Sequence, residues 1–357
     1  MRNHIIEQDL DFIVSANLPW EDLSHKTVLI SGAAGFLPSY MVETLAFLNQ
    51  TKYLNIRIIA LVRHISKANA RFAHLLGKSY LQLLEQDVCT PLHIDEPIDY
   101  IIHAASFATP KMFDNDPVAT ILPNVIGTKN LLELAVQKNI STFLFFSTSG
   151  VYGFVPDQNY PIKEDDFGAL NPMHPSSCYL ESKRMGENMC SCWHKQHNVP
   201  VKIVRPAITY GPGLDLKGGR SFEDFTSCIV ENRDIILHSD GNAIRNFCYI
   251  ADATLGFFSV LLKGKNGEAY NIATDHEISI KDLAQELVTN IFPERNLQVL
   301  FKYDQSKQAI RTNFSRTTVD ISKAKSLGWT LSFPIKEGFK RVVASFEKKT
   351  QSGKDVQ

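Results

Sequence analysis

The fold is decided by residues 27–35, which read Thr-Val-Leu-Ile-Ser-Gly-Ala-Ala-Gly. The first five form an apolar run of the length of a buried strand. The glycines at 32 and 35 follow at once, and a helix through Leu48 is expected after them. Backbone N–H groups at the start of such a helix suit a pyrophosphate, and glycines let the backbone approach it closely. An ordinary strand-to-helix loop is the alternative.

The turn departs from the usual glycine pattern at one position. A third glycine is expected three residues after Gly35, but Pro38 occupies that site. Proline is tolerated in the first turn of a helix, so the helix should persist. Gly32, Gly35, Phe36 and Leu37 are therefore the first candidates for holding a dinucleotide.

In the sequence after residue 35, apolar strands are expected to alternate with helices. Helices are expected over 67–76 and 123–138 and around Tyr179, and further strands over 56–62, 80–84, 100–103, 143–147 and 201–204. Alternation of this kind predicts an α/β fold with a parallel, doubly wound sheet of the Rossmann type. From about residue 207 the elements become shorter and richer in turn signals, which indicates a smaller C-terminal α/β lobe that covers a substrate.

The chain is expected to divide into four regions. Residues 1–26 are an N-terminal helical extension with an amphipathic helix over 4–18. Residues 27–206 form the dinucleotide-binding domain, 207–348 form mainly the substrate-binding lobe, and 349–357 are a polar tail.

Composition excludes several classes of protein. The 357 residues are 44 % hydrophobic, enough for a large core, and 37 basic against 38 acidic residues leave a net charge of -1. Without a basic cluster we expect no nucleic-acid partner, and without an apolar run of about 18 residues no membrane span. The six cysteines lack metal-ligand spacing, so no metal site is expected, and reduced thiols with no signal peptide predict the cytoplasm.

Tyr179 and Lys183 are the candidate catalytic pair. Four residues apart on a helix, they lie on one face. A positive charge about 4 Å from a phenol is worth roughly 4 kcal/mol at an effective dielectric near 20, or about three pKa units. We therefore expect Lys183 to lower the pKa of Tyr179 enough to make it a base near neutral pH. Ser147, Thr148 and Ser149 end a strand, and a hydroxyl there could share the transferred proton; a hydroxylated loop is the alternative.

The choice of cofactor is less determined. NAD-binding turns usually end their second strand with an acid that holds the ribose hydroxyls, but here Arg63 follows Val62. Arg63, with Lys67, could meet the 2′-phosphate of NADP; stacking on adenine or facing solvent are the alternatives. Asp87 and Val88 are placed to hydrogen-bond the adenine, with a turn cap as the alternative for Asp87.

Together these motifs resemble the extended short-chain dehydrogenase/reductase family that acts on nucleotide-activated sugars. The resemblance runs from about residue 26 to 345, and it is closest to the UDP-glucuronate decarboxylase (UDP-xylose synthase) branch. The stretches that carry it are Val151-Tyr152-Gly153 after Thr148, Cys178 to Arg184, Tyr210-Gly211-Pro212, Gly219 to Phe222, and Arg245 to Ile250.

The resemblance implies roles for named residues. Thr148, Tyr179 and Lys183 would be catalytic, with Tyr179 and Lys183 also contacting the cofactor, NAD. The segment Ala104-Ala105-Ser106 would hold the dinucleotide with Gly32, Gly35 and Asp87. Ser149, Arg220 and Arg245 would meet a nucleoside-diphosphate sugar, although surface ion pairs are the alternative for both arginines. A homodimer is expected on the same ground.

Three positions depart from the family pattern. Gly150 stands where the decarboxylase branch has a glutamate, Ser149 and Gly150 replace the Asp-Glu pair of 4,6-dehydratases, and Ile208 replaces an asparagine. Small neutral residues there are closer to 4-epimerases. The main expectation is oxidation of the sugar C4 hydroxyl to a 4-keto intermediate, followed by 4-epimerisation or a related redox-neutral conversion. The alternatives are a decarboxylase or 4,6-dehydratase, an NADPH-dependent 4-ketosugar reductase, and a dinucleotide-sensing regulatory protein.

Overall fold

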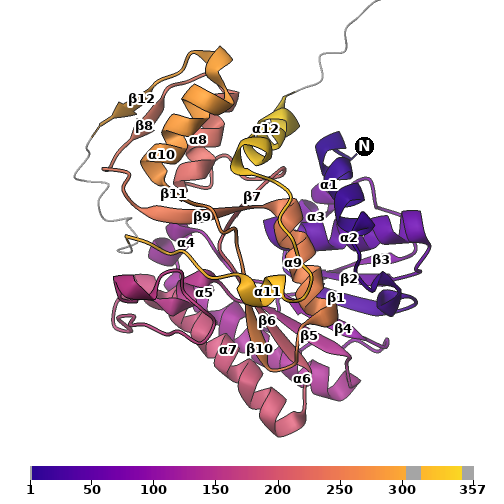
Figure 1. Cartoon of the computed structure of the whole chain (residues 1–357). Coiled ribbons are helices and arrows are strands. Elements are labelled where there is room, and N and C mark those ends of the chain that lie inside the picture. Colours follow the sequence, from indigo (N-terminus) through magenta and orange to yellow (C-terminus); the bar gives the residue numbers. More distant parts are fainter. Residues whose placement is uncertain (1, 303–314, 348–357) are drawn as a thin grey trace, which may run out of the picture.

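The computed structural model describes residues 2–302 and 315–347 (Figure 1). Its main feature is a seven-stranded sheet in the order β10-β6-β5-β4-β1-β2-β3. Every neighbouring pair is parallel, which confirms the expected doubly wound α/β sheet. The strands are β1 (Thr27–Ser31), β2 (Arg57–Val62), β3 (Leu81–Glu85), β4 (Tyr100–His103), β5 (Thr142–Phe146), β6 (Val201–Pro206) and β10 (Glu268–Ile272).

Alternation along the strands builds two cores, one on each face of the sheet. In β1, Val28 and Ile30 pack into one cluster and Leu29 into the other. The first face carries α2 (Phe36–Lys52) and α9 (Ile250–Lys263). The second carries α6 (Thr128–Lys138) and α7 (Cys178–His197). Because both faces are covered, the central strands β1 and β5 are buried at every position and read as apolar runs, which is what made them visible in the sequence.

The N-terminal extension contains the expected amphipathic helix, α1 (His4–Ser15), followed by a 3-10 turn, η1 (Trp20–Leu23). Helix α1 buries Ile5, Leu10, Ile13 and Val14, and it packs against α2, α9 and the last helix, α12 (Ile335–Phe346). The buried face explains why the helix forms without a long apolar run.

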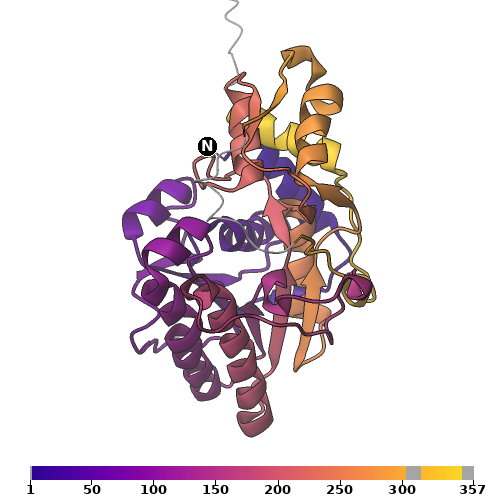
Figure 2. The same cartoon turned by 90° about the vertical axis from the view of Figure 1, so that its left-hand side faces the viewer.

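A group of smaller elements lies beyond the carboxyl end of β6 (Figures 1 and 2). It begins with β7, which follows β6 directly in the chain. A three-stranded sheet has the order β11-β9-β7, and β12 pairs with β8. The bounds are β7 (Ile208–Tyr210), β8 (Ile235–Leu237), β9 (Ile244–Tyr249), β11 (Glu277–Ser279), β12 (Val299–Phe301), α8 (Ser221–Val230), α10 (Ile280–Glu286), η6 (Leu287–Ile291) and η7 (Pro293–Arg295). The short helix α11 (Ser322–Lys325) lies apart from them, against β10 of the large sheet. Since β10 and α9 return to the large sheet, the division at residue 206 stays a prediction, and the polar tail lies outside the described residues.

Two helices differ from expectation. The helix expected over 67–76 is shorter, as α3 (Ile65–Arg71). The helix expected over 123–138 continues from α5 (Pro117–Leu122) through a π-helical turn, η2 (Pro123–Gly127), into α6. Proline has no N–H for the helical ladder, and a wider turn at Pro123 accommodates the loss. No helix in the described ranges is long and apolar enough to cross a membrane.

Candidate active site

The candidate site lies at the carboxyl edge of the sheet, where the strand order reverses between β1 and β4. Gly32 follows β1 with a φ of 65°, a left-handed conformation that favours glycine. A Cβ there would lie 2.7 Å from the Cα of Ala105. The Oγ of Ser31 accepts hydrogen bonds from the N–H groups of Ala104 and Ala105, each at 3.2 Å. The glycine turn and the segment after β4 are therefore packed together.

The turn itself has the shape that a dinucleotide needs. The N–H of Gly35 donates to the carbonyl of Gly32 at 2.8 Å, and α2 begins at the next residue, Phe36. The first N–H groups of an α-helix have no partner within the helix, so those of Phe36 and Leu37 are free to bind a pyrophosphate. The tight turn at Gly32 and the N–H groups at the start of α2 thus fit the pyrophosphate of a dinucleotide.

Thr148 and Tyr179 meet at the end of β5. Thr148 caps a 3-10 turn, η3 (Ser149–Tyr152), and its Oγ1 accepts from the N–H of Gly150 at 3.2 Å. Burial raises the pKa of Tyr179 to about 12, while the hydrogen bond with Thr148 and the charge of Arg220 act in the opposite direction. The structure therefore brings Thr148, Tyr179 and Arg220 together.

Lys183 is anchored beneath the same strand end. Its side chain is 2 % exposed, and its Nζ donates to the carbonyl of Phe146 at 2.6 Å. Burial lowers the pKa of Lys183 to about 7, against the opposing charge of Glu187. The expectation that Lys183 lowers the pKa of Tyr179 is wrong for this structure. Lysine and tyrosine share a helix face, but burial of the phenol prevails, and the opposing groups are Thr148 and Arg220.

The candidate adenosine-binding residues make local contacts. The Oδ1 of exposed Asp87 accepts from the N–H of Cys89 at 2.8 Å, which is the turn cap that was the alternative for this residue. The carbonyl of Val88 accepts from Asn130 at 3.0 Å. Exposed Arg63 stacks its guanidinium 4.5 Å from the ring centroid of Phe107, and Ser106 lies next to that ring in the chain.

The two candidate substrate arginines differ in setting. Arg220 is the N-cap residue of α8 and pairs with Glu223, a fully buried carboxylate. Arg245 lies on β9, where its Nη1 donates to the carbonyl of Ile244 at 2.8 Å. Burial lowers the pKa of Arg245, with Tyr160 acting against the shift. Ser149 lies in η3, directly after Thr148. Of the two arginines, Arg220 is the one whose charge acts on the pKa of Tyr179.

Sequence reasoning missed two neighbours of the site. Phe113, on α4 (Pro110–Asn115), stacks on Tyr179. Asn124, in the π-helical turn, donates to the Oγ of Ser182 at 3.0 Å. Within the described residues, its Oδ1 and the Oγ of Ser147 are buried without a hydrogen-bond partner. The proline inside an otherwise helical pattern was the signal that could have drawn attention to Asn124.

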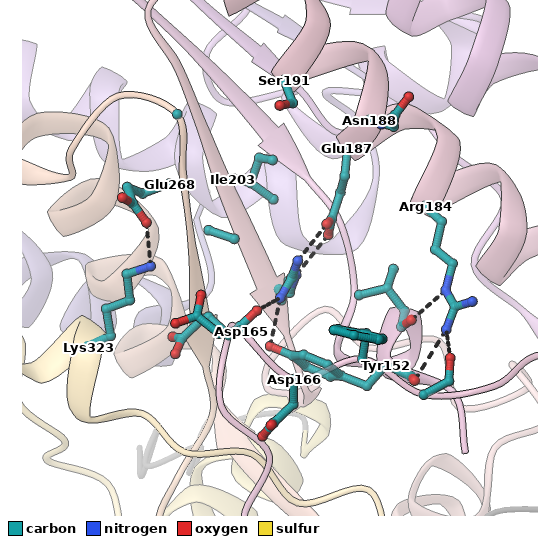
Figure 3. Close-up of a pocket in the computed structure, with 17 residues that line it drawn as sticks. Tyr152, Asp165, Asp166, Arg184, Glu187, Asn188, Ser191, Ile203, Glu268 and Lys323 are labelled. Carbon is teal, nitrogen blue, oxygen red and sulfur yellow. Dashed lines mark hydrogen bonds and ion pairs between the residues drawn. The ribbon is translucent and has the colours of Figure 1, made fainter. Parts of the chain in front are cut away.

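A cavity of about 530 Å³ is lined by Arg184, Glu187, Asn188 and Ser191 of α7 and does not include Tyr179 (Figure 3). Arg205 and Glu187 form a bidentate ion pair in its wall, with N–O distances of 2.7 and 2.9 Å. Arg205 also donates to the hydroxyl of Tyr152 at 3.0 Å. None of the candidate site residues lines this cavity, so it is separate from the site. In the described part of the chain, no group of three acidic, histidine or cysteine side chains could hold a metal.

Comparison with known proteins identifies the family. Residues 28–273 match the model of the NAD dependent epimerase/dehydratase family. UDP-glucuronic acid decarboxylase 5 of Arabidopsis thaliana is 30 % identical over 316 residues, covering 88 % of this chain and 87 % of its own. UDP-glucuronic acid decarboxylase 1 of Danio rerio is 29 % identical over 355 residues, covering 98 % and 80 %.

Solved structures show the same fold. UDP-glucose 4-epimerase of Thermotoga maritima superposes with a TM-score of 0.74 at 22 % identity, covering 90 % of this chain and 98 % of its own. UDP-glucuronic acid 4-epimerase of Bacillus cereus gives 0.71 at 22 % identity, covering 89 % and 98 %. The chain therefore belongs to the NAD dependent epimerase/dehydratase family, the enzymes that include nucleotide-sugar epimerases, dehydratases and decarboxylases and that use NAD.

Proposed function

We propose that the protein oxidises the C4 hydroxyl of a nucleoside-diphosphate sugar and completes a redox-neutral conversion. The conversion that we favour is 4-epimerisation. The observation that carries this proposal is the contact between Thr148 and Tyr179 at the end of β5, with the charge of Arg220 close by. The phenol and the hydroxyl form a path for one proton, and the arginine suits a diphosphate.

The residues of the chain divide the work. Tyr179 takes the proton of the C4 hydroxyl, and Thr148 bridges the two oxygens. Only the ionised phenol can accept this proton. Burial, which raises the pKa of Tyr179 to about 12, therefore opposes the forward step, and Thr148 and the charge of Arg220, which act in the opposite direction, favour it. Lys183, held at the carbonyl of Phe146, orients the nicotinamide ribose. Bound NAD supplies the hydride acceptor and donor of the cycle.

The slot at Ser149 and Gly150 favours epimerisation over carboxylate-dependent chemistry. Neither residue is an acid, and a Cβ on Gly150 would lie 2.5 Å from the Cδ2 of Leu180. A glutamate there would have to displace Leu180. We infer that no acid acts at this position, which is against 4,6-elimination by an Asp-Glu pair.

Decarboxylation of UDP-glucuronate is the second candidate, favoured by the 29–30 % identity to UDP-glucuronic acid decarboxylases over most of the chain. Incubation with UDP-glucuronate, UDP-glucose and dTDP-glucose, followed by NMR of the products, separates the candidates. A sugar inverted at C4 supports epimerisation, and a UDP-pentose supports decarboxylation. A 6-deoxy-4-keto product, or net consumption of NADPH, contradicts both.

We propose NAD rather than NADP as the cofactor in use, because the guanidinium of Arg63 is stacked on Phe107. Gly32, Gly35, Phe36, Leu37 and the segment 104–106 would hold the pyrophosphate and ribose. Mass spectrometry of the dinucleotide released on denaturing the purified protein tests this, and NADP in stoichiometric amount contradicts it.

We further propose a homodimer in the cytoplasm. Apolar side chains are exposed on one face of α5 and η2 and on the neighbouring α7: Val118, Ile121, Leu122, Ile126 and Met185. The first four follow helical spacing, and a second copy related by a two-fold axis would bury this helix pair against its own equivalent. All six cysteines are free, which suits a reducing compartment. Leu122→Arg should convert a dimer to a monomer in sedimentation, and an unchanged mass contradicts this interface.

A further inference from the structure

Arg63 and Phe107 meet from opposite sides of β1. Arg63 follows β2 and Phe107 lies four residues after β4, while β1 runs between those two strands. Strands β2 and β4 are thus two spacings apart, roughly 10 Å. The guanidinium nevertheless lies 4.5 Å from the centroid of the Phe107 ring. The two side chains must therefore reach toward each other across the end of β1.

The glycine turn lies at that strand end. Gly32 is the first residue after β1, and the backbone of Ala105, two residues before Phe107, is packed against it. Arg63 is also close to the loop after β3. Burial raises the pKa of Cys89 to about 12, Asp87 acts in the same direction, and the charge of Arg63 opposes the shift. The segments that follow β4, β1, β2 and β3 therefore converge around the Arg63–Phe107 pair.

We propose that Arg63 and Phe107 form a clasp over the adenosine half of bound NAD and slow its release. An arginine stacked on an aromatic ring offers a flat, positively charged face, which suits a purine and a phosphate more than a ribose hydroxyl. Where the fold usually places an acid at the end of the second strand, this chain has one half of the clasp. Arg63 is exposed, so the pair can part without disturbing either core and let the dinucleotide enter.

The clasp depends on dinucleotide binding alone, not on the sugar reaction. It matters most to a redox-neutral enzyme, in which one NAD molecule serves many turnovers and early release would end the cycle. Its test can therefore be made in the absence of any sugar.

The experiment measures the rate of NAD release by stopped-flow displacement from wild type, Arg63→Ala, Phe107→Ala and the double variant. Each single change should speed release about threefold to tenfold, the range of a cation–π contact that a ligand shields from water. The double variant should be no faster than the faster single one, because both changes break the same contact.

The controls are Arg57→Ala and Phe301→Ala. Arg57 lies at the opposite end of β2 and pairs with Glu96, and exposed Phe301 lies on β12. Neither should alter NAD release. Unchanged release in Arg63→Ala and Phe107→Ala overturns the clasp, and so do additive effects in the double variant. A wild type that prefers NADP, with the preference lost in Arg63→Ala, would make Arg63 a reader of the 2′-phosphate instead.

Discussion

The ring of Phe113 lies flat on the ring of Tyr179, with centroids 4.7 Å apart and planes 11° apart. Phe113 belongs to α4, a short helix after β4, whereas Tyr179 begins the long helix α7. The Sγ of Cys178 also approaches the carbonyl of Phe113, at 3.9 Å. A catalytic phenol thus has one face closed by a segment distant in sequence, and this cover contributes to the burial that raises its pKa.

Removing that cover should shift the pH dependence of the reaction. In Phe113→Ala, water reaches the phenol, and the pKa of Tyr179 should fall from about 12 toward its ordinary value of 10.0. Because the ionised phenol is the base, the rising limb of kcat against pH should move to lower pH. Phe113→Leu, which keeps an apolar cover, is the control and should leave the limb in place. A limb that is the same in all three proteins contradicts this role for Phe113.

Tyr179→Phe should abolish turnover while leaving the dinucleotide site intact. General acid–base catalysis contributes about 10²- to 10⁴-fold, and turnover should fall by at least that much. Calorimetry should show NAD affinity within about twofold of wild type, far less than the 1.4 kcal/mol of a tenfold change. Tyr53→Phe, at a 79 % exposed tyrosine after α2, is the control. Normal turnover in Tyr179→Phe would remove the proposed mechanism.

Lys183→Met should stabilise the fold at neutral pH while it removes activity. The pKa of Lys183 is about 7 in the folded protein against 10.5 as the ordinary value. The unfolded chain therefore binds more protons between these values, and the cost of burying the lysine is full below pH 7 and absent above pH 10.5. The variant avoids this burial cost but also loses the hydrogen bond from Lys183 to the carbonyl of Phe146. The net gain in unfolding free energy near pH 7 is expected to be about 1–3 kcal/mol.

Denaturation of the Lys183 variant in urea at about pH 7 and about pH 10 checks the sign, since the gain should shrink as pH rises. Lys202→Met is the matched comparison. Lys202 is another buried lysine, its Nζ bonded to the carbonyl of Leu261 at 2.6 Å, and burial lowers its pKa to about 8. It should show a smaller gain and keep activity. A gain for Lys183→Met that grows with pH contradicts the argument.

Gly150→Ala should destabilise the protein through Leu180. The new Cβ would lie 2.5 Å from the Cδ2 of that leucine, and overpacking of this kind costs about 1–3 kcal/mol. In the Gly150→Ala/Leu180→Ala double variant the clash is absent, so the two effects should not add. Unfolding in urea measures both. Simple additivity would mean that Leu180 moves aside freely, and the slot would then be open to an acidic side chain.

Asp9→Asn should weaken the attachment of α1. The carboxylate of Asp9 is fully buried and accepts from the hydroxyls of Tyr40 and Tyr249 and from Arg341. Loss of the charge removes the ion pair of Arg341, which keeps only hydrogen bonds to neutral groups such as Gln8 and the carbonyl of Ile5, and should cost about 3 kcal/mol of unfolding free energy. Asp11→Asn, at an exposed position on the same helix, should change it by less than about 0.5 kcal/mol. Equal effects of the two changes contradict a specific role for Asp9.

The large sheet could be predicted because its strands are buried on both faces and therefore read as continuous apolar runs. Strand β5, Thr142–Phe146, is an example. Strand β10 was not predicted, since Glu268–Ile272 lies among short elements and joins the sheet only through β6. A strand added at the edge by a distant segment leaves little local pattern.

The part of the candidate site that was predictable is the part that follows from residue spacing along one helix or strand. Tyr179 and Lys183 lie on one helix, and Thr148 follows shortly after β5, so their proximity follows from topology. The direction in which a long side chain points does not, and Lys183 bonds to Phe146 rather than to the phenol. Phe113 and Phe107 come from segments whose paths depend on tertiary packing. No sequence pattern therefore predicted that Phe113 stacks on Tyr179 or that Phe107 contacts Arg63.

The carboxylate of Asp9 has a consequence for how the candidate site at the carboxyl edge of the large sheet can open. It joins α1 to Tyr40 on the helix that begins at the glycine turn, and through Tyr249 and Arg341 to β9 and α12. Helix α2 of the large-sheet domain and β9 and α12 thus share one buried anchor, which opposes a hinge rotation of α2 against β9 and α12. Ligand entry should instead use short segments near Tyr179 such as α4, and hydrogen exchange should be fast there and slow around Asp9. The elements joined at Asp9 would then stay fixed relative to one another, while short segments such as α4 move to admit the ligand.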